Sequence, residues 1–167
     1  MANILHALPL FDVSFLWHGT RGDDPSVPWD PSALERVSDI PGASFRTTAC
    51  STNPNGDLQV WAATQSGGVY HTIRQASLGT WSPWGDVIAE ILREHPSSPN
   101  PAPVGTIACS ADPTDGNLHV NLATAVRGQS TDGRQWWYTL RFNNTGGWFF
   151  LSQVPVVGSL IAISTSH

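Results

Sequence analysis

The chain repeats itself, and this repeat constrains the fold more than any other feature of the sequence. Residues 48–60 recur as 107–120, with Cys50 matching Cys109 and one extra residue in the turn that follows. Further along, residues 70–74 recur as 137–141, so the residues added between the two matching blocks fall in a polar stretch around 127–133. Homologous units diverge in this way, because a surface loop accepts insertions while the register on both sides is kept.

A third copy at the N-terminus is incomplete. Residues 17–21 match 70–74, and Trp29 and Val37 take the places of Trp81 and Val87. This copy has no first segment, but residues 158–164 near the other end of the chain resemble 105–110. The sequence therefore predicts one domain of three units, with these bounds: 4–38 completed by 159–165, then 43–90, then 104–155.

Each unit is expected to contain four short antiparallel strands. In the second unit, residues 45–50 lead through an Asn-Gly turn, which tolerates positive φ, into an alternating strand at 58–63. In that strand Leu58, Val60 and Ala62 face one way, and the residues between them face the other. Glycine turns then lead to strands at 69–75 and 81–87, and the only predicted helix spans 86–94.

Four-stranded units that repeat and join the two ends of the chain indicate an all-β fold, the β-propeller. Known propellers have about four or more blades, so three blades per chain do not close a ring. We therefore expect completion by oligomerisation, most simply six blades in a homodimer. Whether the split blade closes within one chain or by strand exchange is left open by the sequence.

Composition excludes several classes of function. Charged residues make up 13% of the chain and the net charge is −5, which argues against nucleic-acid binding. Nothing approaches 18 consecutive apolar residues, so no membrane insertion is expected. The N-terminus does not read as a signal peptide, which predicts a cytoplasmic or non-classically secreted protein. The two cysteines make no disulfide framework, and the spacing of the histidines provides no metal site.

The segments 56–62, 68–75 and 81–87 resemble the repeat of the fungal and bacterial propeller lectins that bind fucose or N-acetylglucosamine. Those repeats carry an Asp/Asn-Gly turn, an alternating strand, a Gly-Gly-aromatic-His strand and a Trp-x-x-Trp-Gly motif. The match is good over 45–90, fair over 105–154 and weak over 1–40, and Trp84 of the motif becomes Leu151 in the later unit. The resemblance implies a propeller with sugar sites between neighbouring blades, built from an aromatic, an arginine and often a carboxylate.

In each unit, one repeat position carries an aromatic residue and the position four residues later carries an arginine. Because side chains alternate along a strand, both are expected on the same strand face. An aromatic ring stacks on the C–H face of a sugar, and a guanidinium donates hydrogen bonds to its hydroxyls. The same positions also suit packing between blades, as do the tryptophans at the start of each outer strand. The candidate ligand-binding residues are Trp17, Arg21, Tyr70, Arg74, Trp81, Trp84, Trp137, Arg141 and Trp148.

Other polar residues receive structural interpretations. His18 and His71 are equivalent, with Tyr138 in their place in the third unit, and both are expected to bond to backbone. The segment 112–117 is expected to be a turn, because the closing Glu of a calcium loop is absent. Cys50 and Cys109 are interpreted as small core residues. No catalytic residue, metal or cofactor is assigned.

The first functional hypothesis is a non-enzymatic, multivalent, lectin-like propeller whose partner is a glycan or another small molecule. The alternative is a cofactor-free enzyme, of cyclase or isomerase type, acting on a small hydrophobic substrate in one aromatic-lined pocket. Its motivation is the divergence between units, for example of His71 to Tyr138 and of Trp84 to Leu151. A third hypothesis is a protein-interaction scaffold. One deep cavity per chain favours the enzyme, and repeated shallow grooves favour the lectin.

Overall fold

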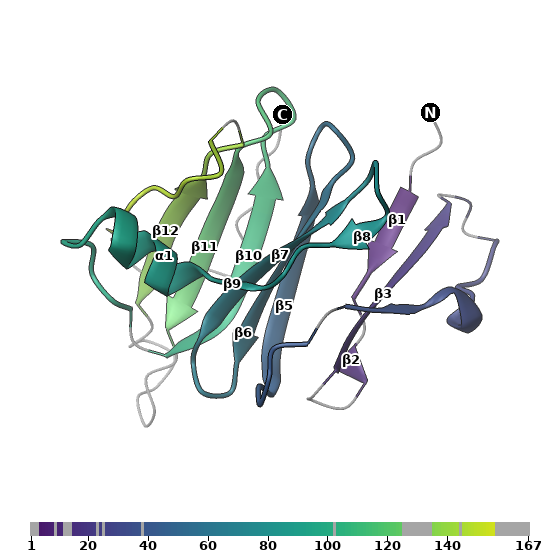
Figure 1. Cartoon of the computed structure of the whole chain (residues 1–167), viewed down its shortest axis with the longest axis horizontal. Coiled ribbons are helices and arrows are strands. Elements are labelled where there is room, and N and C mark those ends of the chain that lie inside the picture. Colours follow the sequence, from purple (N-terminus) through teal and green to yellow (C-terminus); the bar gives the residue numbers. More distant parts are fainter. Residues whose placement is uncertain are drawn as a thin grey trace.

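The computed structural model shows an all-β chain of three antiparallel sheets that lie side by side (Figure 1). It describes residues 4–8, 10–11, 15–22, 24, 26–37, 39–101, 103–124, 135–143 and 145–155. The first sheet contains β1 to β4, the middle sheet β5 to β9 and the third sheet β10 to β13. The middle sheet lies between the other two (Figure 1).

Each sheet is built from consecutive strands of the chain. The strands of the first sheet are β1 (Ile4–Ala7), β2 (Leu10–Phe11), β3 (Phe15–Gly22) and β4 (Glu35–Arg36). Those of the middle sheet are β5 (Phe45–Thr52), β6 (Leu58–Thr64), β7 (Val69–Gln75), β8 (Thr80–Trp81) and β9 (Gly85–Asp86). Those of the third sheet are β10 (Val104–Ala111), β11 (Leu118–Thr124), β12 (Trp136–Arg141) and β13 (Ser152–Val154). A 3₁₀ turn, η1 (Pro31–Ala33), precedes β4, and the helix α1 (Val87–Glu94) follows β9.

The strand registers of the middle and third sheets correspond to each other. In the middle sheet the β5–β6 register shifts between Phe45 and Thr47, and in the third sheet the β10–β11 register shifts at the matching Val104 and Thr106. Arg74 is paired with Trp81, as Arg141 is with Trp148. Equivalent residues therefore occupy equivalent places in the two sheets.

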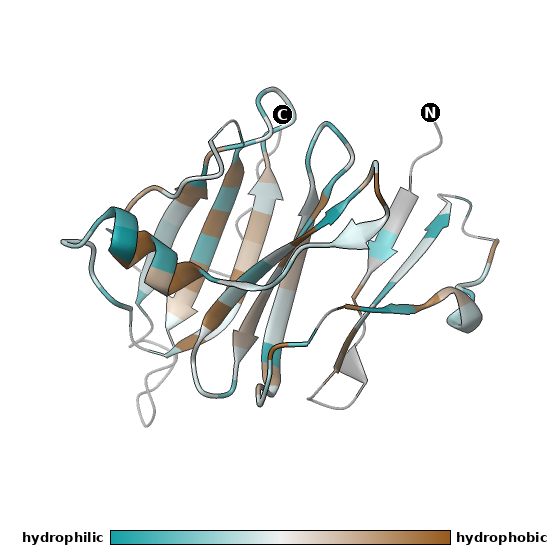
Figure 2. Ribbon diagram, in the orientation of Figure 1, coloured by the Kyte–Doolittle hydropathy of each residue, from teal (hydrophilic) through white to brown (hydrophobic). Residues whose placement is uncertain are grey.

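The core is divided into two clusters, one on each side of the middle sheet. Leu58, Val60 and Ala62 pack toward the first sheet, and Trp61 and Ala63 pack toward the third. This confirms the predicted alternation along β6, every residue of which is buried. Bands of apolar and polar residues alternate along the strands of the third sheet as well (Figure 2). Burial of both faces makes β6 the centre of the structure.

The connections between the sheets differ in length and structure. The connection 37–44 between β4 and β5 contains no helix or strand among its described residues, whereas the connection 87–103 between β9 and β10 contains α1. The predicted helix is confirmed, and Asp86 caps it by accepting a hydrogen bond from the backbone N–H of Ala89 at 3.0 Å. Val87 and Ile91 of α1 are buried against the middle and third sheets. No helix among the described residues is long and apolar enough to span a bilayer.

Some details differ from expectation. The fourth strand of the second unit is two short pieces, β8 and β9, with Pro83 between them, because proline lacks the N–H that a continuous ladder needs. In the first unit the expected fourth strand is reduced to β4, and Trp29 lies before it outside any strand. The described residues do not close into a ring. The predicted strand at 159–165 and the loop around 127–133 lie outside the described residues.

Both cysteines are free and half-buried, each packed against one of the two core clusters. Burial, followed by the neighbouring Cys50, raises the pKa of the Cys109 thiol to about 12. A thiol with so high a pKa forms little thiolate and is unreactive. The residues therefore act as small core side chains, as the sequence indicated.

Candidate functional site

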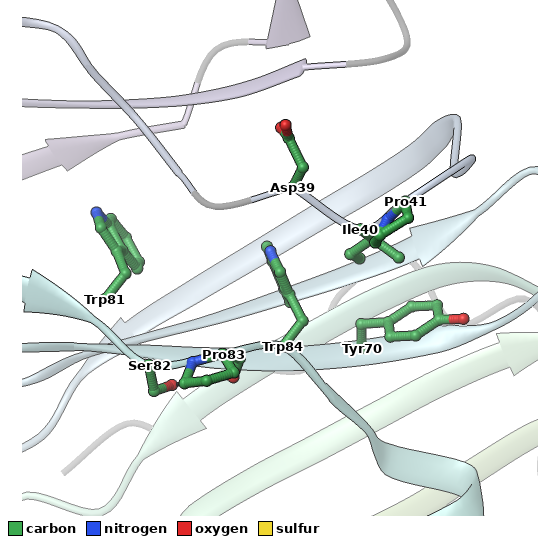
Figure 3. A pocket seen from close by; sticks show the side chains of 8 residues that line it. All are labelled: Asp39, Ile40, Pro41, Tyr70, Trp81, Ser82, Pro83 and Trp84. Atoms are coloured by element: carbon green, nitrogen blue, oxygen red, sulfur yellow. Dashed lines mark hydrogen bonds between the residues drawn. The ribbon is translucent and has the colours of Figure 1, made fainter.

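A cavity of about 650 Å³ opens between the connection 37–44 and the outer part of the middle sheet. Trp81 and Trp84 rise from one segment toward the connection, and Ile40 and Pro41 lie opposite, near Tyr70 (Figure 3). The complete lining is Asp39, Ile40, Pro41, Tyr70, Trp81, Ser82, Pro83 and Trp84. The cavity therefore lies where the first and middle sheets meet, and it gathers three of the predicted ligand-binding residues.

Strand pairing fixes this aromatic wall. β8 and β9 both pair with β7, so that the segment 82–84 between them is held at both ends. The hydroxyl of Thr72 donates to the carbonyl of Ser82 at 2.7 Å, and the Ile73 N–H donates to the Ser82 hydroxyl at 3.0 Å. The two tryptophans therefore extend from an anchored segment, and the site is largely preformed.

The lining is aromatic and carries little charge. The Nε1–H of Trp81 is buried and has no hydrogen-bond partner among the described residues. Asp39 is the only charged residue in the lining, and both of its carboxylate oxygens accept hydrogen bonds from Arg36 at 2.8 Å. Its carboxylate points away from Trp84 in Figure 3. The cavity thus offers aromatic faces with little charge, which suits a neutral ligand that has apolar C–H surfaces.

The equivalent place between the middle and third sheets is filled. The counterparts of Tyr70, Trp81 and Trp84 are all buried, and they are Trp137, Trp148 and Leu151. The helix α1 covers them: Glu90 accepts from the Nε1–H of Trp148 at 2.7 Å, and Glu94 accepts from its backbone N–H at 2.8 Å. The same tryptophan position is therefore satisfied by α1 in one interface and left unpaired beside a cavity in the other.

Behind the cavity, a chain of polar side chains joins the first and middle sheets. His18 Nδ1 lies 2.7 Å from Glu35 Oε1, which also accepts from Nε of Arg74. Since His18 donates to Glu35 through Nδ1, its Nε2 is left to accept a hydrogen bond from His6 Nδ1 at 3.0 Å. The ring of His18 also meets Trp81 edge-on at 5.5 Å, so this chain supports one wall of the cavity.

Burial and neighbouring charges shift the pKa values of this chain. Burial, and then the nearby His18 and Arg74, lower the pKa of His6. Burial also lowers the pKa of His18, although the bond to Glu35 acts in the opposite direction. Burial alone acts to raise the pKa of Glu35, but the hydrogen bonds from Arg74 and His18 and their charges hold it below its usual value. Near neutral pH these four hydrogen-bonded side chains are therefore two neutral imidazoles, a carboxylate and a guanidinium.

The nine predicted residues fall into three places. Tyr70, Trp81 and Trp84 line the cavity, and Arg74 lies beside it, paired with Glu35. Arg21 is on the face of the first sheet that points away from the middle sheet, as is Trp17, because neighbouring Leu16 and His18 face the middle sheet. The remaining three are Trp137, Arg141 and Trp148, which lie between the middle and third sheets, where both tryptophans are buried.

The histidine prediction is wrong in its partners. His18 bonds to Glu35 and His6, and His71 bonds to the side-chain oxygen of Gln59 at 2.8 Å. Each histidine points out of its sheet, because strand side chains alternate between the faces, so side chains and not backbone groups are within reach. The segment 112–117 forms the predicted turn, in which Asp112 accepts from the backbone N–H of Thr114.

Sequence reasoning missed the opposite wall of the cavity and the acid that joins the sheets. Asp39, Ile40 and Pro41 lie in a connection that has no repeat to mark it. Glu35 has no acidic counterpart in the other units, where Gly85 and Ser152 take its place. The one available signal was the short connection after the first unit, which lacks the helix found after the second.

Comparison with known proteins identifies a fold but no family. No protein-family model and no curated protein matches the sequence. Among solved structures, the K499G mutant of the NanB sialidase from Streptococcus pneumoniae is similar, with a TM-score of 0.57 and 16% identity over 89% of this chain and 21% of that chain. NanB in complex with 2-[(3-chlorobenzyl)ammonio]ethanesulfonate gives a TM-score of 0.58 and 15% identity over 93% of this chain and 22% of that chain.

The chain thus spans about a fifth of the length of the sialidase chains that it matches. At this identity the likeness concerns the fold alone. Sialidases of this kind are β-propellers, so the stacked antiparallel sheets of this chain are arranged like part of a propeller.

Proposed function

We propose that this chain is a carbohydrate-binding protein of the β-propeller class, which holds a neutral sugar in the cavity between the first and middle sheets without transforming it. The observation that carries the proposal is the aromatic wall of Tyr70, Trp81 and Trp84 beside an open cavity, at a place that the next interface fills with α1. The resemblance to propeller lectins and the sialidase-like fold support the same class of ligand.

The chemistry of the lining favours a neutral sugar. Indole and phenol rings stack on the C–H face of a pyranose, and the hydroxyl of Tyr70 gives the lining a group that can hydrogen-bond a sugar oxygen. No arginine, lysine or histidine belongs to the lining, so a sugar carboxylate has no cation to meet there. A neutral hexose is therefore expected to bind in preference to an acidic one.

The same lining favours binding over catalysis. Most glycoside hydrolases use a pair of carboxyl groups on either side of the scissile bond, and sialidases, which use a tyrosine nucleophile, are an exception. In this cavity Asp39 is the only carboxylate of the lining, and Arg36 already engages it. The cofactor-free enzyme stays as the second candidate on one observation, namely that the cavity is not repeated in the next interface. Turnover of a small hydrophobic substrate that requires Asp39 supports that candidate.

The first test is sugar binding by calorimetry, guided by a glycan array. We expect a neutral monosaccharide, with fucose and N-acetylglucosamine tried first, to bind with a dissociation constant near the millimolar range, about −4 kcal/mol. Replacing Trp84 with alanine removes a stacking face and is expected to weaken binding at least about tenfold, which corresponds to about 1.4 kcal/mol. Lack of binding to every monosaccharide at millimolar concentration contradicts the proposal.

Two further variants serve as controls for the effect of Trp84→Ala on binding and on stability. Phe150→Ala removes an aromatic ring that is 43% exposed on the third unit and is expected to leave sugar binding unchanged. Trp84 packs against the core cluster of the first and middle sheets, so its loss also affects stability. Tyr70→Phe removes only a hydroxyl from the lining, and a measurable loss of affinity in that variant locates the sugar without disturbing the fold.

A further inference from the structure

Two sheet faces have no neighbouring sheet among the described residues. On the first sheet this open face carries Phe15, Trp17 and Arg21, with Trp29 and Leu34 lying over Gly19. On the third sheet it carries His119, Asn121, Tyr138 and Leu140, which cross-strand pairing places on one side. The middle sheet has both of its faces covered. The open faces are therefore the two ends of the stack in Figure 1.

The two covered interfaces are built in the same way. The earlier sheet presents a hydrogen-bonded pair from two adjacent strands: His6 of β1 with His18 of β3 in the first sheet, and Gln59 of β6 with His71 of β7 in the middle sheet. The later sheet presents a tryptophan edge-on to that pair. The rings of His18 and Trp81 are 5.5 Å apart, and those of His71 and Trp148 are 5.7 Å apart.

The open faces carry the two halves of this same arrangement. The third sheet ends in the corresponding pair, in which His119 Nδ1 and the Tyr138 hydroxyl lie 2.9 Å apart. The first sheet carries the corresponding tryptophan and arginine, with the guanidinium of Arg21 5.2 Å from the ring centre of Trp29. The pair of Arg141 and Trp148 in the covered interface has nearly the same geometry, at 5.7 Å.

Exposure shows that these halves lack a partner within the described chain. Trp29 is 39% exposed, whereas its counterpart Trp148 is 2% exposed. His119 and Tyr138 are half-buried, although Gln59 and His71 at the same positions are buried. Among the described residues, Arg21 bonds only within its own sheet region, where its guanidinium donates to the carbonyl of Val27 at 3.0 Å, whereas Arg74 at the matching position binds Glu35 across the interface.

We propose that a second copy of this chain supplies the missing neighbour: the open face of the third sheet in each copy packs on the open face of the first sheet in the other. Two identical joints then give a closed pair of chains, in which Trp29 and Arg21 of one copy meet the His119–Tyr138 pair of the other. Asn121 stands where the middle sheet has Trp61, so the joint is more polar than the covered interfaces. Such a surface is typical of an association between folded partners.

The test is the mass of the chain in solution, measured by sedimentation equilibrium over a range of concentrations. The expected value is twice the chain mass of 18.0 kDa, falling toward the single chain on dilution. Trp29→Glu on the first sheet and Leu140→Glu on the third are each expected to weaken the association at least about tenfold. Leu78→Glu is the control, because Leu78 is 67% exposed in a turn outside both faces.

A mixture of the two variants makes the test specific. In a Trp29→Glu chain paired with a Leu140→Glu chain, one joint combines two unaltered faces, so the mixture is expected to associate more strongly than either variant alone. Far-UV circular dichroism confirms that each variant is folded, and Arg21→Ala is a milder replacement for Trp29→Glu. A parent that stays at 18.0 kDa at every concentration overturns the proposal, as does a mixture that associates no better than its components. Neither outcome bears on sugar binding by the single chain.

Discussion

Replacing Trp61 with alanine is expected to lower the free energy of unfolding by about 4 kcal/mol. Trp61 is completely buried at the centre of the structure, on the face of β6 that packs against the third sheet. Its ring meets Trp148 edge-on at 5.1 Å and lies 5.0 Å from the ring of His71. Alanine leaves a cavity that the surrounding β-sheets are too rigid to close.

Urea unfolding followed by tryptophan fluorescence and circular dichroism measures this loss, and the chain provides its own control. Asn121 holds the same repeat position in the third sheet, but on the open face. Asn121→Ala is expected to cost less than about 0.5 kcal/mol when measured at a concentration at which the chain is single. Equal losses for the two variants contradict the assignment of one face as covered and the other as open.

Acidification from pH 7 to pH 4 is expected to destabilise the fold strongly. Burial, and then the charge of Arg141, lower the pKa of His71 from 6.5 to about 3. Between these two values the unfolded chain binds a proton that the folded chain excludes, so stability is full above pH 6.5 and is lost as the pH falls. At 1.36 kcal/mol per pH unit, His71 accounts for about 3 kcal/mol of this loss by pH 4. The lowered pKa values of His6 and His18 act in the same direction.

Urea midpoints measured at several pH values test this expectation. His71→Tyr is the informative variant, because the third unit carries Tyr138 at the same position and bonds it to a strand neighbour. The variant is expected to lose less stability than the parent between pH 7 and pH 4, whatever its stability at pH 7. If the parent and the variant show the same pH dependence, His71 is not the buried proton-excluding group that the structure indicates.

The strand order and register follow closely from the sequence. The repeat is visible because the same small and β-branched residues recur in the same alternation, and alternation decides which face a side chain takes. Leu58, Val60 and Ala62 therefore fell on the predicted side of β6. The turns were predictable for a similar reason, since Gly56 and Gly116 adopt φ values of +89° and +74°, which glycine adopts readily.

The site was predictable only in part, because its character depends on what lies opposite each residue. Trp81 and Trp148 occupy the same repeat position and have the same strand partner type. One faces a short connection and lines a cavity, while the other is covered by α1 and bonds to Glu90. The repeat positions can therefore be read from the sequence. Whether such a residue is covered or lines a cavity depends on the non-repeating connections, whose packing the repeat does not predict.

If both proposals hold, the assembly carries at least two copies of the cavity on one rigid body. Two weak sites on a rigid pair gain apparent affinity for a multivalent glycan surface, provided that the geometry allows both to bind at once. Binding to an immobilised glycan is then expected to weaken when Trp29→Glu separates the chains, while binding to the free monosaccharide does not change.

The most direct measurement of the central proposal is a crystal structure of the chain soaked with the monosaccharide that binds best in solution. The expected result is a pyranose in the cavity, with a C–H face against the ring of Trp81 or Trp84. A sugar bound at full occupancy elsewhere on the chain, with this cavity left to solvent, contradicts the account.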